Sequence, residues 1–208
     1  MAGRQWRRSA GAPRGQHFLG DAAVAAAVVE NAGIAVSDLV VEFGAGYGRL
    51  TEQLAARAGQ VIAVELDSRL AARLAGRFRE RANVTVMHGD ALAVPLPRRE
   101  FKVVSNPPFH ITSPLLHRLL DDQRVPLLRA DLVVEWGTAL ALTGVFGPAH
   151  KARPWRSRYE FLLLRRLPAA MFDPAPAGDA AVVSIRRLPS HAVGRSAQRA
   201  TPGPPWPG

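Results

Sequence analysis

The fold is decided by Leu39-Val40-Val41-Glu42-Phe43-Gly44-Ala45-Gly46-Tyr47-Gly48, a strand-like run that leads through a glycine-rich loop into a helical stretch. The glycines allow close approach of the backbone to a ligand, and a helix offers unpaired amide groups at its start. The spacing is G-x-G-x-G and not G-x-G-x-x-G, which argues against a nicotinamide or flavin cofactor. The pattern predicts an α/β sheet that binds a ligand at the carboxyl end of this strand.

Two acidic residues follow later strand-like runs. Residues 60–65 end on Glu65, a suitable acceptor for the two hydroxyls of a ribose. Residues 83–87 are followed by His88-Gly89-Asp90, where a carboxylate could accept the amino group of an adenine. Each acid alone is more often a surface or capping residue. Their place at successive strand ends beside a glycine loop favours a shared ligand site.

The next strand-like run, residues 101–105, leads into Asn106-Pro107-Pro108-Phe109. The Asn amide can both donate and accept hydrogen bonds, the prolines hold the backbone extended with a carbonyl pointing outward, and Phe109 offers a flat face. Together these groups predict a pocket for an exocyclic amine on an aromatic base. The alternative is an ordinary proline-rich turn after a strand.

Five motifs in this order resemble the class I S-adenosylmethionine methyltransferases, and within them the erythromycin-resistance (Erm) family of ribosomal RNA adenine-N6 methyltransferases. The resemblance runs from Gly15 to about Leu188. It includes Gly15-Gln16-His17-Phe18-Leu19, similar to the motif before the family's first helix, and residues 172–176 and 182–185, similar to its last hairpin.

The resemblance implies a Rossmann-like methyltransferase fold, a mostly parallel seven-stranded sheet with an antiparallel last strand. Further strands are expected at 132–136, 160–167 and 181–188, with a helix from Gly137. The implied catalytic residues are Asn106, Pro107 and Phe109. The implied residues for S-adenosyl-L-methionine are Gln16, His17, Leu19, Glu42, Gly44, Gly46, Glu65, Leu66, Asp90, Ala91 and Asn106. His17 departs from the Asn of many relatives.

The formal net charge is +10, and arginine supplies nearly all of the positive charge. This balance indicates a polyanion partner, although a generally arginine-rich composition with solvated side chains would give the same sum. Arginines beside a tryptophan are typical of contacts with splayed single-stranded RNA. The RNA-binding candidates are therefore Arg4, Arg7, Arg8 and Arg14 around Trp6, and Arg153 and Arg156 beside Trp155.

Three segments are expected: a basic N-terminal arm at 1–14, a methyltransferase domain at 15–188, and a proline-rich, disordered tail at 189–208 in place of the relatives' helical domain. The chain has no cysteine, hence no disulfide or thiolate metal site. No metal is expected, because the histidines lack H-x-x-x-H spacing. The alanine-rich residues 22–29 are expected to form a helix capped by Asp21 and are too short to span a membrane.

The sequence thus predicts a cytoplasmic, monomeric enzyme that methylates N6 of an adenosine in 23S ribosomal RNA. The family resemblance further implies macrolide-lincosamide-streptogramin resistance. Three alternatives stay open: a small-subunit rRNA dimethyltransferase of ribosome biogenesis, which would resemble Asn-Leu-Pro-Tyr at the catalytic motif; a DNA adenine or protein glutamine methyltransferase; and an inactive RNA-binding relative.

Overall fold

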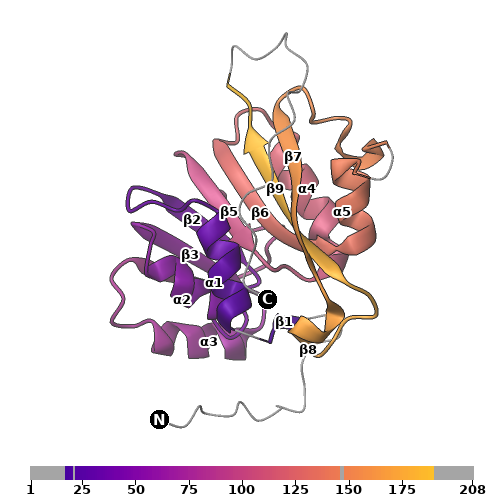
Figure 1. The fold of residues 1–208 in the computed structure, drawn as a ribbon. Helices are drawn as coiled ribbons and strands as arrows, with labels where there is room; N and C mark the ends of the chain where they lie inside the picture. The colour runs from indigo at the N-terminus through magenta and orange to yellow at the C-terminus, as the bar shows by residue number, and fades with distance from the viewer. Residues whose placement is uncertain (1–16, 21, 146–147, 190–208) are drawn as a thin grey trace.

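A seven-stranded sheet in the order β4-β3-β2-β5-β6-β9-β7 forms the centre of the computed structural model (Figure 1). The structure describes residues 17–20, 22–145 and 148–189. The strands are β2 (Leu39–Phe43), β3 (Gln60–Glu65), β4 (Val84–His88), β5 (Phe101–Ser105), β6 (Leu127–Glu135), β7 (Tyr159–Leu167) and β9 (Ala180–Arg187). The first five run parallel, and β9 is antiparallel to both β6 and β7. The predicted Rossmann-like methyltransferase fold is confirmed.

Helices cover both faces of the sheet (Figure 1). One face carries α1 (Ala22–Asn31), α2 (Arg49–Ala55) and α3 (Ser68–Arg77), and the other carries α4 (Thr112–Leu120) and α5 (Trp136–Thr143). Alternating side chains of β2 divide between the two cores: Val41 and Phe43 face α4 and α5, whereas Val40 faces α1 and α2. None of these helices is long and apolar enough to cross a membrane, within the part of the chain that the structure describes.

A two-stranded ribbon joins distant parts of the chain. In it β1 (Phe18–Leu19) pairs antiparallel with β8 (Phe172–Asp173), which follows the short 3-10 helix η3 (Ala169–Met171). The amide of Gly20 extends the contact by donating to the carbonyl of Met171 at 2.7 Å. This ribbon fixes the segment before α1 against the connection between β7 and β9.

Strand β6 is longer than the sequence predicts. We expected a strand at 132–136, but it begins at Leu127 and ends at Glu135, and Trp136 starts α5. Arg129 and Asp131 interrupt the apolar pattern in the part that the prediction missed. Two residues apart, they bind each other, with Arg129 Nε 2.6 Å from Asp131 Oδ2.

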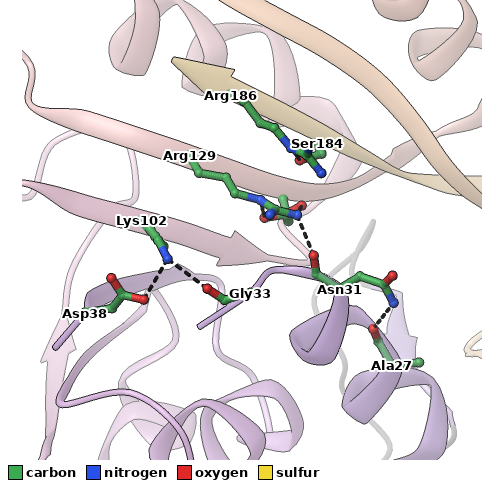
Figure 2. A network of polar contacts seen from close by, with 9 residues as sticks. Ala27, Asn31, Gly33, Asp38, Lys102, Arg129, Ser184 and Arg186 are labelled. Carbon is green, nitrogen blue, oxygen red and sulfur yellow. Dashed lines mark hydrogen bonds and ion pairs between the residues drawn. The ribbon is translucent and has the colours of Figure 1, made fainter. Parts of the chain in front are cut away.

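These two residues belong to a group of paired charges at the amino ends of the parallel strands, which we call the amino-edge network (Figure 2). One part of this network is centred on Lys102 of β5. Its Nζ donates to Asp38 Oδ2 at 2.7 Å and to the Gly33 carbonyl at 2.9 Å. In the other part, Arg129 Nη2 donates to the Asn31 carbonyl at 2.6 Å. Both cations therefore bind carbonyls at and just beyond the C-terminus of α1, where a positive charge is favoured.

Candidate active site

The glycine-rich loop after β2 lies against the predicted catalytic motif, Asn106–Phe109, after β5. The amides of Gly44 and Ala45 donate to the Val64 carbonyl at 2.8 and 3.0 Å, which fixes the loop over β3. Gly44 has a φ of 75°, and a Cβ there would lie 3.3 Å from Pro108 Cδ. A side chain at position 44 would therefore be strained and would crowd the Asn106–Phe109 turn.

The loop and the turn share one pocket. It is lined by Phe18, Leu19, Glu42, Gly44, Ala45, Tyr47, Arg49, Leu50 and Asn106. Four of the predicted site residues, Leu19, Glu42, Gly44 and Asn106, are thus brought together. Five lining residues were not among the predicted ones: Phe18, Ala45, Tyr47, Arg49 and Leu50. The first three belong to the motifs that defined the site.

Glu65 is the acid predicted to bind a ribose, and its carboxylate lies under the loop. It is 1% exposed; Oε2 accepts from the Gly46 amide at 2.7 Å and Oε1 from the Asp67 amide at 2.9 Å. Because a carboxylate has about four acceptor positions, two remain for a ligand. The next residue, Leu66, exposes 64% of its surface at the same strand end and offers an apolar face.

Asp90 lies on the same edge of the sheet, since Glu65 is level with His88, the last residue of β4. Its side chain is exposed, and Oδ1 accepts from the Leu92 amide at 2.8 Å. That bond shapes the loop and leaves the second carboxylate oxygen to other donors. Ala91 beside it is buried.

Glu42 is a second buried carboxyl in this region, 1% exposed, and it accepts a hydrogen bond from the Thr51 hydroxyl at 2.6 Å. Burial raises the pKa of Glu42 to about 8, the Thr51 bond acts in the opposite sense, and the negative charge of Glu65 raises it further. The carboxyl is therefore mostly protonated at neutral pH. A cation in the pocket would favour its ionised form.

The two polar atoms of the Asn106 side-chain amide differ in their hydrogen bonding. Its Nδ2 donates to the His17 carbonyl at 2.7 Å, whereas its Oδ1 is buried and has no hydrogen-bond partner in the described structure. An unpaired buried acceptor is costly, and it is the kind of group that a ligand's N–H satisfies. The His17 side chain is held by the residue after β8, with its Nδ1 2.9 Å from the Pro174 carbonyl.

The other residues of the predicted catalytic motif lie around this amide. Pro107 is buried, and Phe109 begins the 3-10 helix η1 (Phe109–Ile111). The Phe109 ring is half-buried, 5.5 Å from the His17 ring and edge-on to Phe172 at 6.4 Å. The predicted catalytic residues and His17 therefore form one cluster at the carboxyl edge of the sheet.

The two RNA-binding candidates that the structure describes do not lie in this cluster. Arg153 and Arg156 are exposed, and the Arg156 guanidinium donates to the Thr143 carbonyl at 2.9 Å, at the end of α5. Their segment leads into β7 from the amino edge, opposite Asn106. The two arginines therefore lie at the edge of the sheet opposite the predicted catalytic residues.

Trp155 does not support the expected stacking role. It is 3% exposed, and its Nε1 donates to Asp121 Oδ1 at 2.7 Å, so the expectation of an aromatic ring offered to RNA is wrong. Five other candidates, Arg4, Arg7, Arg8, Arg14 and Gln16, and the helix cap Asp21 lie outside the described residues. Among the described residues no group of three His, Asp or Glu side chains could hold a metal ion.

Comparison with known proteins places the chain in a family. The sequence matches the family described as ribosomal RNA adenine dimethylase over residues 12–196. It is 34% identical over 173 residues to an rRNA adenine N-6-methyltransferase of Bacillus licheniformis, which covers 83% of this chain and 60% of that protein. It is 38% identical over 178 residues to a probable ribosomal RNA small subunit methyltransferase A of Methanosarcina acetivorans, covering 84% of this chain and 65% of that protein.

A solved structure agrees with these relatives. The crystal structure of the 23S rRNA methyltransferase ErmE matches with a TM-score of 0.78 and 28% identity, covering 86% of this chain and 72% of that one. The chain spans less than two thirds of the length of the two curated relatives above. With the fold and the motifs in agreement, the chain belongs to the ribosomal RNA adenine dimethylase family.

Proposed function

We propose that this protein transfers a methyl group from S-adenosyl-L-methionine to N6 of a specific adenosine in 23S ribosomal RNA. In a cell this activity would confer macrolide-lincosamide-streptogramin resistance. The observation that carries the proposal is the buried, unpartnered Oδ1 of Asn106, which lines the same pocket as Glu42 and Gly44. An acceptor in this position suits the amino group of a flipped adenine.

The residues at the carboxyl edge suit S-adenosyl-L-methionine, which supplies an electrophilic methyl group when bound. Glu65 has acceptor positions left for the ribose hydroxyls, and Asp90 has one oxygen left for the adenine amine. The exposed Leu66 would cover the adenine ring, and Glu42 would face the ammonium group of the methionine part. The glycine loop leaves room for the cofactor backbone.

The protein then has to prepare the target nitrogen. The lone pair of the adenine N6 is delocalised into the ring, so Asn106 Oδ1 and the Pro107 carbonyl would accept its two protons and favour a tetrahedral nitrogen. Phe109 would stack on the base. The N6–carbon bond forms as the carbon–sulfur bond breaks, the electron pair stays on sulfur, and the nitrogen releases one proton to water. Positioning and electrostatics carry most of the rate.

Among the similar proteins, one is named for 23S ribosomal RNA and another for the small ribosomal subunit. The choice between these two targets therefore rests on the sequence of the Asn106–Phe109 motif. The chain carries Asn106-Pro107-Pro108-Phe109, whereas small-subunit enzymes resemble Asn-Leu-Pro-Tyr at this place. This difference favours 23S ribosomal RNA over the small-subunit alternative. We further propose that the protein acts in the cytoplasm as a monomer, where ribosomal RNA is its macromolecular partner.

The test is a methylation assay with two substrates. The protein is incubated with methyl-labelled S-adenosyl-L-methionine and deproteinised 23S or 16S ribosomal RNA, with Asn106→Ala as the inactive control. We expect label in 23S RNA and, after primer extension, a new stop at one adenosine. Label in 16S RNA alone would establish the small-subunit alternative. No label in either RNA, with cofactor binding intact, would indicate an inactive RNA-binding relative.

A further inference from the structure

We propose that the backbone carbonyl of His17 is a positioning group for the catalytic amide. It holds Asn106 with Oδ1 toward the target amine, and it therefore makes an amide, rather than a carboxylate, necessary at position 106. This inference rests on the proposed function, because it assigns the two ends of Asn106 to different partners.

The orientation of the amide follows from chemistry. The atom of Asn106 that lies 2.7 Å from the His17 carbonyl must be Nδ2, because a carbonyl oxygen accepts and never donates. Oδ1 is then the atom left buried and unpartnered. Were the amide reversed, two oxygens would face each other and the open group would be a donor, which cannot receive an amine N–H.

The carbonyl is itself held in place from the far end of the chain. His17 precedes β1, in which Phe18 is paired with Asp173 and Leu19 with Phe172. The bond between His17 Nδ1 and the Pro174 carbonyl, 2.9 Å long, adds a side-chain contact. Strand β8 thus fixes the acceptor that orients Asn106, although 89 residues separate Asn106 from His17.

Strand β8 also supports the other catalytic side chain. Phe172 is 4% exposed and its ring meets Phe109 edge-on at 6.4 Å. The same two-residue strand therefore contacts Phe109 directly and Asn106 through His17. This arrangement gives the β1–β8 ribbon a role in the geometry of the reaction beyond holding the N-terminal segment.

A carboxylate at position 106 distinguishes this role from simple packing. Asn106→Asp keeps an acceptor for the target amine but places a charged oxygen against the His17 carbonyl, with no proton between them. Two facing acceptors without a donor are unfavourable, and the carboxyl should hold its proton to higher pH. The protonated acid restores both contacts, since its O–H donates to His17 and its C=O accepts from the amine.

The experiment has two readouts. In the first, NMR with 13C-labelled aspartate follows the carboxyl introduced by Asn106→Asp in the full chain. We expect it to titrate above about pH 6, compared with about 3.9 for a free Asp. Titration near the ordinary value would overturn the inference whether or not the protein methylates RNA, so this readout separates its failure from that of the proposed function.

The second readout is single-turnover methyl transfer from pH 5.5 to 8.5, given as the ratio of variant to wild type. Using the ratio cancels the effects of pH on the other ionisable groups near the site, which are His17 before β1, Glu42 on β2, Glu65 at the end of β3 and Asp173 on β8. We expect the variant to be about 100-fold slower at pH 8 and to recover about tenfold by pH 5.5. A variant within a few fold of wild type at pH 8, or a slow variant with a flat ratio, would overturn the inference.

Asn83→Asp is the matched control. Asn83 is half-buried, and its Nδ2 donates to the Ala55 and Ala58 carbonyls at 2.9 and 3.0 Å, away from the site. The change removes the same kind of bond and should lower the thermal midpoint. The ratio of its transfer rate to wild type should not depend on pH in the way expected for Asn106→Asp.

Discussion

Buried polar groups are paired at the amino edge of the sheet, whereas one at the carboxyl edge has no partner in the described structure. At the amino edge, Lys102 is paired with Asp38 (Figure 2), and Arg129 is paired with Asp131. At the carboxyl edge, Asn106 Oδ1 is buried without a partner. Both arrangements occur on β5, which carries Lys102 near its start and leads into Asn106 at its end.

The same contrast between the two edges is seen in two buried carboxyl groups, Glu42 at the carboxyl edge and Asp131 in the amino-edge network. Each is a carboxyl that is 1% exposed, and burial raises the pKa of both. Asp131 has Arg129 beside it, whereas no cation is paired with Glu42 among the residues that the structure describes. We infer that the paired edge contributes stability and that the unpaired groups receive their partners from the proposed ligands. Substitutions at the amino edge should therefore lower the free energy of unfolding, whereas substitutions at the carboxyl edge should affect methyl transfer or cofactor binding.

The largest effect is expected at the amino edge, from Asp131→Ala. It leaves Arg129, whose side chain is 15% exposed, without its carboxylate. Removing one partner of a buried pair costs about 3 to 5 kcal/mol, which urea unfolding would measure. Cofactor affinity of the folded fraction should stay unchanged. An unaltered unfolding free energy would remove the stabilising role that we assign to this edge.

Asn106→Ala should have the converse effect at the carboxyl edge. We expect the rate of methyl transfer to fall by about 3 kcal/mol of transition-state stabilisation, or roughly 150-fold, because the lost contact forms mainly in the transition state. The dissociation constant for S-adenosyl-L-methionine, measured by calorimetry, should stay within a few fold. Near-normal turnover would exclude Asn106 from the chemistry.

Glu65→Ala should weaken cofactor binding without removing the fold. Loss of charge-assisted hydrogen bonds to a ribose would raise the dissociation constant for S-adenosyl-L-methionine by about one to two orders of magnitude. Glu65 also accepts from Gly46 and Asp67, so thermal unfolding has to accompany the calorimetry. Unchanged affinity in a folded variant would take Glu65 out of the cofactor site.

Glu42→Gln should change how stability depends on pH. The folded pKa of Glu42, about 8, exceeds the ordinary glutamate value of 4.5, so its contribution to stability is full below about pH 4.5 and is lost as the pH rises through 8. Relative to wild type, the variant should gain on the order of 4 kcal/mol of unfolding free energy between pH 5 and 9, at about 1.4 kcal/mol for each unit of pKa shift in that interval. Urea unfolding at the two pH values would measure this gain. An equal stability difference at both would show that Glu42 titrates normally.

The sequence was sufficient for the features that depend on local patterns. The glycine loop, Glu65, Asp90 and Asn106 each follow an apolar run of strand length, and all four lie at the same edge of the sheet. The start of β6 was missed because Arg129 and Asp131 look like surface residues until each is seen to neutralise the other.

Contacts between residues far apart in the chain could not be predicted from the sequence. Trp155 stands among arginines, but the Asp121 that accepts from its indole lies 34 residues away, and no local pattern shows that the ring is buried. The bonds of Asn106 to His17 and of Glu42 to Thr51 likewise depend on how the elements pack. The sequence therefore predicted which groups lie together at the carboxyl edge of the sheet, but not which of their atoms lack a hydrogen-bond partner.

The most direct test of the central claim is the identity of the methylated atom. Ribosomal RNA is incubated with the protein and methyl-labelled S-adenosyl-L-methionine, digested to nucleosides and analysed by mass spectrometry. If Asn106 Oδ1 receives the exocyclic amine of adenine, the label will be in N6-methylated or N6,N6-dimethylated adenosine, and Asn106→Ala will abolish it. Label on a ring nitrogen, a ring carbon or a ribose hydroxyl would contradict the account, because none of these atoms presents an amine to that acceptor.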